Sequence, residues 1–157
     1  MTNKPVLKNP DTQLRKLSQK VPLETINSPR IQTLIDDLME TMKMENGIGI
    51  AAPQIGIHEQ IIIVDDGHEP VALINPNIIS RSSSMIDFEE GCLSIPGVYG
   101  IVQRHRNVEV EALDRNAHPL LIKADGLLSV VLQHETDHLE GVLFIDKVIR
   151  YTNPPRL

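Results

Sequence analysis

Several residue types are scarce in this sequence, and each scarcity excludes a class of protein. There is one cysteine, Cys92, so an internal disulfide framework cannot form. Aromatic residues make up 3% of the chain and tryptophan is absent, which leaves aliphatic side chains to fill the core. No apolar run approaches the roughly 20 residues that span a bilayer, and Met1 to Lys8 lacks the apolar stretch of a secretory signal. These features predict a cytosolic protein without a membrane segment.

The length and net charge of the chain bear on the number of domains and on nucleic-acid binding. The chain has 157 residues, which suits a single domain over residues 1–157. Its 15 basic and 21 acidic residues give a net charge of -6. This balance argues against binding that depends on neutralising phosphates, so no specific nucleic-acid partner is expected.

The first half of the chain contains one clear helix signal. Ser28 is a suitable N-cap, and Pro29 suits the first helical position. Asn46-Gly47 is placed to end the helix. Between these limits, apolar residues recur with helical spacing at Ile31, Leu34, Ile35, Leu38 and Met42. We expect this helix to be scaffold, with one face in the core.

Short β-branched or alternating runs predict strands, and a second helix follows them. The strands are expected at Gln60 to Val64, Val71 to Ile74 with an end at Pro76, Val108 to Ala112 and Leu120 to Lys123. The helix is expected over Asp125 to Leu139, capped by Asp125 and ended by Gly141. The predicted fold class is α+β, with short, mostly antiparallel strands packed around this helix of the C-terminal half.

The second helix carries the strongest functional pattern, His134-Glu135-Thr136-Asp137-His138. Two histidines one turn apart project from the same face and can hold one metal ion, while Glu135 beside them can move protons. The same short pattern also arises by chance on surface helices. Here the flanking residues are apolar, and unpaired imidazoles in or near a core are costly, so the setting favours metal ligation.

Cys92 is the natural candidate for a third ligand. A catalytic zinc-type site has three protein ligands and one open position, and the helix supplies two of the three. Gly91, directly before Cys92, allows another group to approach the sulfur closely. The alternatives are a buried structural thiol and a cysteine-protease nucleophile. The protease alternative leaves the second histidine and Glu135 without roles.

A third segment, Gly47 to Gln54, combines small residues with one amide side chain. Its lack of bulk suits a wall against which a peptide backbone can lie, and Gln54 offers a hydrogen-bond donor. A loop packed against the first helix is the simpler interpretation. The spacing does not match glycine-rich phosphate-binding loops.

Taken together, these segments resemble the peptide deformylase family, whose motifs are G-x-G-x-A-A-x-Q, E-G-C-L-S and Q-H-E-x-D-H-L-x-G. This chain contains all three in that order, at Gly47 to Gln54, Glu90 to Ser94 and Gln133 to Gly141. A weaker similarity extends from Asn9 to Asp146.

The resemblance implies a metal site and a substrate. Cys92, His134 and His138 would bind one divalent metal ion, with Fe2+ favoured and Zn2+, Ni2+ or Co2+ as replacements. The reaction would remove the formyl group from N-formylmethionyl nascent peptides and release formate.

The resemblance also implies roles in catalysis and substrate binding. Glu135 would transfer protons, while the Gln54 amide and the Leu93 backbone N–H would stabilise the oxyanion. An apolar pocket for methionine would be formed by Ile48, Tyr99, Val130 and Val131, with backbone contacts to the peptide from Gly47, Gly49 and Gly97. Candidates to orient the metal ligands, as a charged network, are Glu90, Arg104 and Asp137, and an ordinary surface charge is an equal alternative for each. The remaining histidines, His58, His68, His105 and His118, are expected to be solvated.

The chain departs from many bacterial members of that family after Arg150. Two prolines, Pro154 and Pro155, disfavour a further C-terminal helix there, so we expect at most transient proximity to the ribosome. Two other functions remain open at this point: an H-E-x-x-H metallopeptidase, and a non-catalytic metal-binding module. The expected location is a bacterial-type cytosol, with an organelle or viral origin left open.

Overall fold

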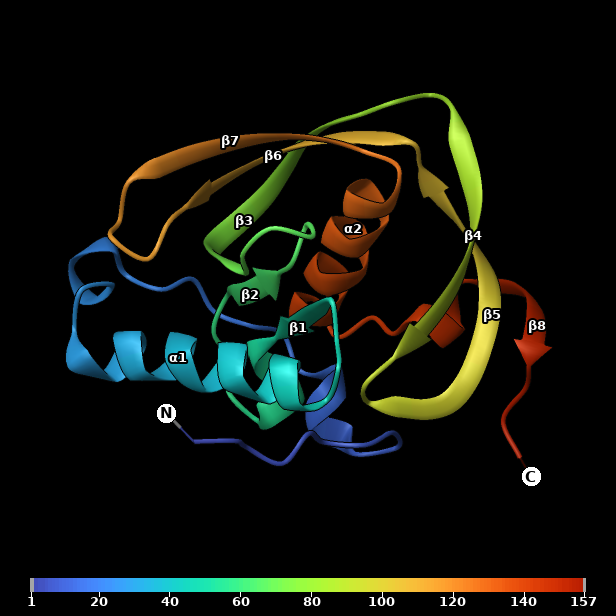
Figure 1. Cartoon of the computed structure of the whole chain (residues 1–157), viewed down its shortest axis with the longest axis horizontal. Coiled ribbons are helices and arrows are strands. Elements are labelled where there is room, and N and C mark those ends of the chain that lie inside the picture. The colour runs from blue at the N-terminus through green and yellow to red at the C-terminus, as the bar shows by residue number, and fades with distance from the viewer. Residues whose placement is uncertain (1, 157) are drawn as a thin grey trace.

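The computed structural model describes residues 2–156 and confirms the α+β class, with one helix held between two antiparallel sheets (Figure 1). The larger sheet has the strand order β1 (Gly49–Ala51), β2 (Ile61–Val64), β3 (Val71–Arg81), β6 (Asn107–Leu113) and β7 (Pro119–Asp125). The smaller sheet has the order β4 (Met85–Cys92), β5 (Ile95–His105) and β8 (Val148–Asn153). The helices are α1 (Pro29–Met44) and α2 (Leu127–Leu139), and the short 3-10 helices are η1 (Thr12–Arg15), η2 (Leu23–Thr25), η3 (Ala52–Ile55) and η4 (Phe144–Asp146).

Helix α1 begins and ends where the sequence predicts. The Ser28 side chain accepts a hydrogen bond from the Ile31 N–H at 3.4 Å, and Pro29 is the first helical residue. Met44 is the last helical residue, and Asn46 then adopts a left-handed backbone with φ of 54°. All five residues of the predicted apolar stripe are buried, and α1 packs against β1 and β2. The helix is therefore scaffold for β1, the strand within the Gly47 to Gln54 segment.

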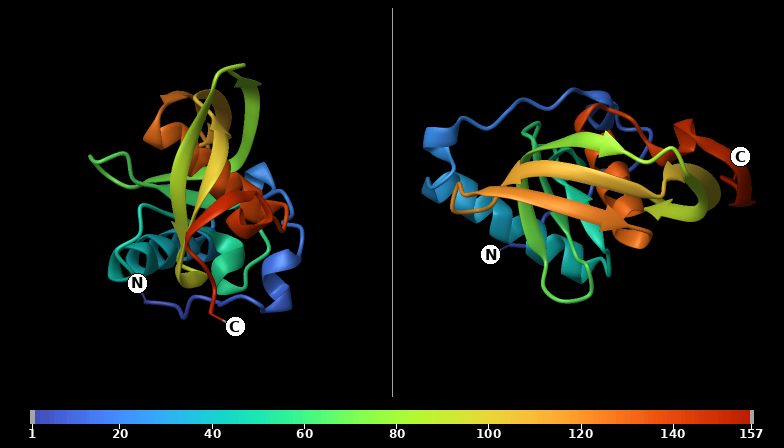
Figure 2. Two further views of the ribbon diagram at one scale, coloured as in Figure 1. Left: turned by 90° about the vertical axis from the view of Figure 1, so that its right-hand side faces the viewer. Right: turned by 90° about the horizontal axis from the view of Figure 1, so that it is seen from above.

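Helix α2 lies between the two sheets, and its contacts include β1, β2, β5 and β7 (Figures 1 and 2). Its buried residues include both histidines and Glu135 of the metal-binding pattern. The predicted cap at Asp125 is wrong, because Asp125 is the last residue of β7 and pairs with Asn107. Gly126 is the N-cap instead, with φ of 60°. A tight reversal from strand to helix requires this left-handed backbone, which glycine adopts without a steric penalty.

The four predicted strands all lie in the larger sheet, but β3 is longer than expected. It continues through Pro76 to Arg81. Its pairing with β6 shifts register between Ile74 and Asn77, so Pro76 sits at an irregularity of the ladder. Proline is tolerated at such a bulge because no ladder hydrogen bond depends on its missing N–H.

The smaller sheet positions the segment around Cys92. Strands β4 and β5 form an antiparallel pair, in which Met85 lies opposite His105 at one end and Cys92 lies opposite Ile95 at the other. Leu93 and Ser94 therefore form the tight turn between the two strands. The final strand, β8, pairs with β5. The sequence predicts no helix after Arg150, and residues up to Asn153 belong to this strand. Among residues 2–156, no helix is long and apolar enough to cross a membrane.

The N-terminal segment is tied to α1 through Asp37, which is 4% exposed. The Thr2 N–H donates to Asp37 Oδ1 at 2.7 Å, and Lys4 Nζ lies 3.5 Å from Asp37 Oδ2. Burial alone would raise the pKa of Asp37. The hydrogen bonds from Thr2 and the charge of Lys4 outweigh burial and lower the pKa below its ordinary value.

Asp37→Asn is therefore expected to lower the free energy of unfolding by about 1 kcal/mol at neutral pH. A lowered folded-state pKa contributes stability above the unfolded pKa of about 3.9, and that contribution is lost as the pH falls through the folded value. Urea unfolding from neutral to acidic pH measures the difference, which should shrink at the acidic end. Asp36→Asn, which removes a more exposed partner of Arg115, is the control. A difference that does not change with pH would contradict this account.

Candidate active site

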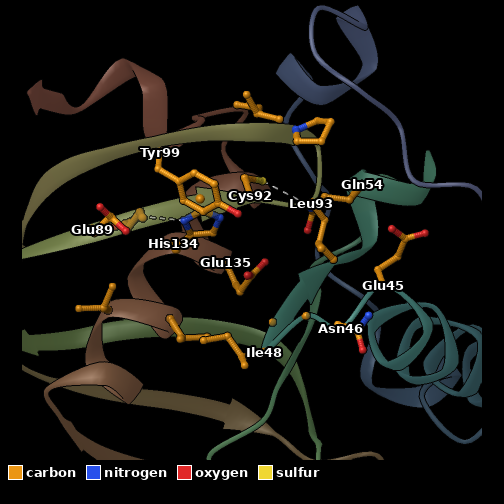
Figure 3. Close-up of a pocket in the computed structure, with 18 of the residues that line it drawn as sticks. Glu45, Asn46, Ile48, Gln54, Glu89, Cys92, Leu93, Tyr99, His134 and Glu135 are labelled. Atoms are coloured by element: carbon orange, nitrogen blue, oxygen red, sulfur yellow. Dashed lines mark hydrogen bonds and ion pairs between the residues drawn. The ribbon is translucent and has the colours of Figure 1, made fainter. Parts of the chain in front are cut away.

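Two elements from different parts of the fold bring three metal-ligand side chains together. His134 and His138 lie one turn apart on α2, and Cys92 ends β4. One ligand atom from each of the three residues lies within 4.8 Å of the others. Cys92 Sγ is 3.3 Å from His138 Nε2, and the two imidazole rings meet edge-on with centroids 5.1 Å apart. Figure 3 shows His134 and Cys92 facing each other across the site.

This donor set fits a divalent metal ion. Burial alone would raise the pKa of the Cys92 thiol, but the charge of His138 and hydrogen bonds from both histidines hold it well below its usual range. The thiolate is the form that binds metal. His134 donates a hydrogen bond from Nδ1 to the Glu90 carboxylate at 2.8 Å. The other ring nitrogen, Nε2, is then the atom that can bind a metal ion. One thiolate and two imidazoles suit zinc and several other first-row metals.

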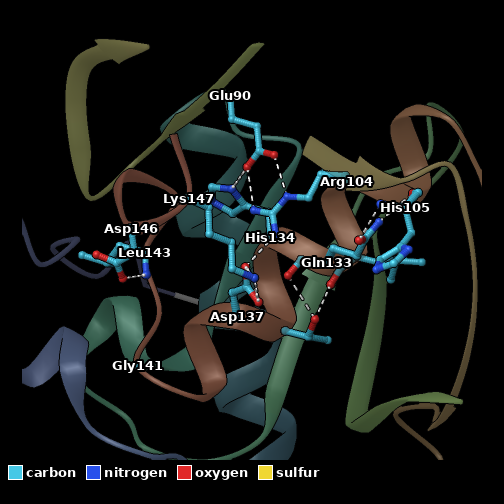
Figure 4. Close-up of polar contacts among 12 residues, drawn as sticks. Glu90, Arg104, His105, Gln133, His134, Asp137, Gly141, Leu143, Asp146 and Lys147 are labelled. Atoms are coloured by element: carbon cyan, nitrogen blue, oxygen red, sulfur yellow. Dashed lines mark hydrogen bonds and ion pairs between the residues drawn. The ribbon is translucent and has the colours of Figure 1, made fainter. Parts of the chain in front are cut away.

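A buried ion-pair network supports the ligand His134 (Figure 4). Arg104 donates to both Glu90 oxygens at 2.7 and 2.9 Å, and to Asp137 at 2.7 Å. Burial alone would raise the pKa of Glu90, but the bonds from Arg104 and His134 lower it to about 2. Glu90 is therefore a carboxylate at neutral pH. The three residues predicted to orient the ligands form one network, which Lys147 extends through an ion pair with Asp137 at 3.0 Å.

The Gln54 amide is held in one orientation. Its Oε1 accepts a hydrogen bond from the Ala51 N–H at 2.9 Å. Its Nε2 therefore points the other way, donating to Ser94 Oγ at 3.1 Å and lying 3.6 Å from Cys92 Sγ. Gln54 is 1% exposed, in η3 directly after β1. A fixed donor next to Cys92 suits stabilisation of negative charge that develops beside the ligand set.

Glu135 presents a carboxylate inside the same site. The residue is 4% exposed, and its Oε2 has no hydrogen-bond partner among residues 2–156. Burial raises its pKa to about 7. A Cβ placed on Gly49 would lie 2.5 Å from Glu135 Oε1. Any residue larger than glycine would therefore collide with the carboxylate in its present position. A buried carboxyl group with a pKa near neutrality can both accept and release a proton.

A cavity of about 650 Å³ opens onto these groups. The seven residues predicted for substrate binding all line it: Gly47, Ile48, Gly49, Gly97, Tyr99, Val130 and Val131. Val130 and Val131 are buried, whereas Ile48 and Tyr99 are 48% and 45% exposed and lie nearer the rim (Figure 3). A Cβ on Gly91 would come within 2.6 Å of Tyr99 Cε1, so glycine allows the Tyr99 ring to lie against β4.

Sequence reasoning missed several residues of the site. Ser94, within the E-G-C-L-S motif, accepts a hydrogen bond from Gln54, and Leu127 and Lys8 line the cavity. Proximity to a motif could have indicated Ser94, but Lys8 lies far from the motifs in sequence. The expectation that every other histidine is solvated holds for His68 and His118 only. The exceptions, His58 and His105, are half-buried and bond to the backbone oxygens of Gln13 and Ser82.

The fold and the site fit the class of metal-dependent hydrolases, with a helical H-E-x-x-H pattern and one cysteine that together could hold a metal ion. Residues 3–153 match the family model described as polypeptide deformylase. A peptide deformylase of Acetivibrio thermocellus is 48% identical over 141 residues, which cover 90% of this chain and 81% of the relative. The chain belongs to the polypeptide deformylase family.

Solved structures agree with this assignment. A peptide deformylase from Legionella pneumophila superposes with a TM-score of 0.88 at 42% identity, covering 94% of this chain and 86% of that one. A class I type b peptide deformylase from Acinetobacter baumannii, solved with Met-Ala-Ser bound, has a TM-score of 0.89 at 34% identity. That match covers 94% of this chain and 99% of the relative.

Arg104→Met is expected to weaken metal binding about 10-fold to 100-fold, because Glu90 would no longer be held against His134. It should also lower the free energy of unfolding by about 3 kcal/mol or more, since two carboxylates would lose their buried partner. Competition with a chromogenic chelator and urea unfolding measure the two effects. Lys147→Met removes the more exposed partner of Asp137 and is the control. Metal affinity within twofold of the parent protein would contradict the role of Arg104.

Proposed function

We propose that this chain hydrolyses the formamide bond of N-formylmethionyl peptides, releasing formate and a free methionine amine. The observation that carries the proposal is the convergence of the Cys92, His134 and His138 donor atoms beside a cavity. Gln54, Cys92, His134 and Glu135 all line that cavity. A purely structural metal site needs neither a free buried carboxylate nor an oriented amide. Membership of the deformylase family favours this activity over a metallopeptidase or a non-catalytic module.

Glu135 is the residue proposed to move protons. When bound, a divalent metal would supply Lewis acidity to a water molecule and to the formyl oxygen. As the water oxygen bonds to the formyl carbon, Glu135 accepts the proton that the water loses. When the C–N bond breaks, Glu135 delivers that proton to the departing nitrogen. Its pKa of about 7 suits both transfers at neutral pH.

Gln54 and Leu93 are proposed to stabilise the oxyanion. The formyl oxygen gains negative charge when the water adds to the carbon. The Gln54 Nε2 donor, which points to the Cys92 and Ser94 side, and the backbone N–H of Leu93 are the groups suited to meet that charge. Removing one such donor in other hydrolases costs roughly 3 kcal/mol of barrier.

The remainder of the cavity is proposed to bind the methionine side chain and the peptide. Val130 and Val131 form an apolar inner wall, with Ile48 and Tyr99 nearer the rim. Gly47, Gly49 and Gly97 are the proposed backbone contacts. The Acinetobacter baumannii relative bound to Met-Ala-Ser supports a short peptide that begins with methionine. The partners would be N-formylmethionyl nascent peptides, met near the ribosome where translation starts with formylmethionine.

Fe2+ is the metal ion we propose for the native enzyme, with Zn2+, Ni2+ or Co2+ as replacements. Borderline-soft divalent ions of this series accept one thiolate and two imidazoles. The family is metal-dependent, and the three ligands of this chain provide one site for such an ion.

The direct test is release of formate from formyl-Met-Ala-Ser by anaerobically purified, iron-loaded protein. The parent is expected to turn over, and Glu135→Gln is expected to lose about 100-fold to 10,000-fold in kcat because the proton acceptor is gone. Metal analysis serves as the control, since both proteins should hold equal metal. Failure of the fully loaded parent to release formate would refute the proposed function.

Gly49→Ala tests whether Glu135 must occupy its place beside β1. The added methyl group would displace the carboxylate, and kcat is expected to fall about 100-fold, as for other misplacements of about 1 Å. Thermal unfolding should change little, because the end of a flexible side chain can move. In the Glu135→Gln background the same substitution should cost much less, as expected for two changes that act on one group. Equal losses in both backgrounds would show that Gly49 acts independently of Glu135.

A further inference from the structure

A short N-terminal segment, Leu7 to Asn9, contacts both loops that carry the proposed oxyanion donors. The Leu7 N–H donates to the Gln54 carbonyl at 2.7 Å. The Asn9 N–H donates to the Ser94 carbonyl at 2.8 Å. Between them, Lys8 Nζ donates to the Leu93 carbonyl at 2.7 Å. Three consecutive residues thus bond to the loop of Gln54 on one side and to the Leu93-Ser94 turn on the other.

These two loops belong to different sheets. Gln54 lies in η3 after β1 of the larger sheet, whereas Leu93 and Ser94 join β4 to β5 in the smaller sheet. The side-chain hydrogen bond between the loops is donated by the Gln54 amide, the same group that is needed as a donor to the oxyanion. Oxyanion stabilisation depends on donors held within about 0.5 Å of the productive geometry. A separate backbone connection between the loops would supply that constraint without occupying the donor.

Lys8 adds a charge-assisted hydrogen bond to this connection. An ammonium group binds a carbonyl oxygen more strongly than a neutral donor does. The bond restrains the Leu93–Ser94 peptide plane, which adjoins the peptide plane that carries the Leu93 N–H, the second donor. Among residues 2–156, Lys8 takes part in no ion pair, in contrast to Lys4, which pairs with Asp37 away from the site.

We infer that Leu7 to Asn9 is a brace that sets the separation of the two oxyanion donors, and that Lys8 is its positioning side chain. The inference rests on the proposed function, because it assigns a catalytic consequence to the brace. Lys8 does not touch the reacting atoms in this account. It acts through Leu93, so its loss changes how well the transition state is stabilised rather than how well the peptide binds.

A different role is open to Lys8 because it also lines the cavity. Its ammonium could bind a carboxylate of the peptide substrate. The two roles separate in the kinetic constants, because a substrate-binding lysine affects KM and a positioning lysine affects kcat. The neutral peptide amide formyl-Met-Ala-Ser-NH2 removes the C-terminal carboxylate and is therefore the substrate to use.

Lys8→Met is expected to lower kcat on this amide about fivefold, the equivalent of one lost hydrogen bond, with KM within twofold of the parent. Lys8→Arg keeps a cationic donor and should restore most of the rate. Lys4→Met, which removes the neighbouring lysine from its pair with Asp37, should leave kcat unchanged. A rise in KM alone, or an unchanged kcat in Lys8→Met, would overturn the inference.

Amide hydrogen exchange of the zinc-loaded protein tests the brace without turnover. Exchange of the Leu7 and Asn9 amides should be about fivefold faster in Lys8→Met than in the parent, while the buried amide of Val110 in β6 keeps its rate. Unchanged protection at Leu7 and Asn9 would refute the brace even in an active enzyme. An inactive parent with faster exchange in Lys8→Met would instead refute the proposed function and leave the mechanical connection in place.

Discussion

The guanidinium of Arg104 is 2% exposed, and a positive charge at that depth requires compensation by nearby carboxylates. Glu90 and Asp137 supply it from two directions, one from β4 and the other from α2. The same ion pairs therefore join the smaller sheet to the central helix and turn the Glu90 carboxylate toward His134. The position of α2 against the smaller sheet and the orientation of the His134 ring depend on this buried cluster of charges.

Much of the site could be predicted from the sequence because its residues fall in short, specific patterns. His134 and His138 are spaced by one helical turn, so a correct helix assignment places both on one face. Cys92 is the single cysteine, which left no other thiol to consider. The residues proposed for the substrate pocket line one cavity with Cys92 and His134, and their individual roles remain predictions.

The remaining features depend on long-range pairing that no local pattern reports. Strands β4, β5 and β8 have mixed burial, and their pairing joins residues as distant as Tyr99 and Asn153. Asp125 has a side chain suited to a helix N-cap, but it pairs with Asn107 of β6 and therefore belongs to β7. Gly126, the next residue, is the N-cap of α2 instead. Lys8 reaches Leu93 across 85 positions of sequence, a contact that only the folded chain creates.

Glu90 and Cys92 lie two positions apart at the end of one strand, separated by Gly91 and a register shift. The strand thus supplies both Cys92, a proposed metal ligand, and the carboxylate that accepts the hydrogen bond from His134, another proposed ligand. A small sliding of β4 against α2 would carry thiolate and carboxylate together by the same amount. The spacing between Cys92 and Glu90 is therefore that of a single β-strand, whereas the distances from Cys92 to His134 and His138 are set by how β4 packs against α2.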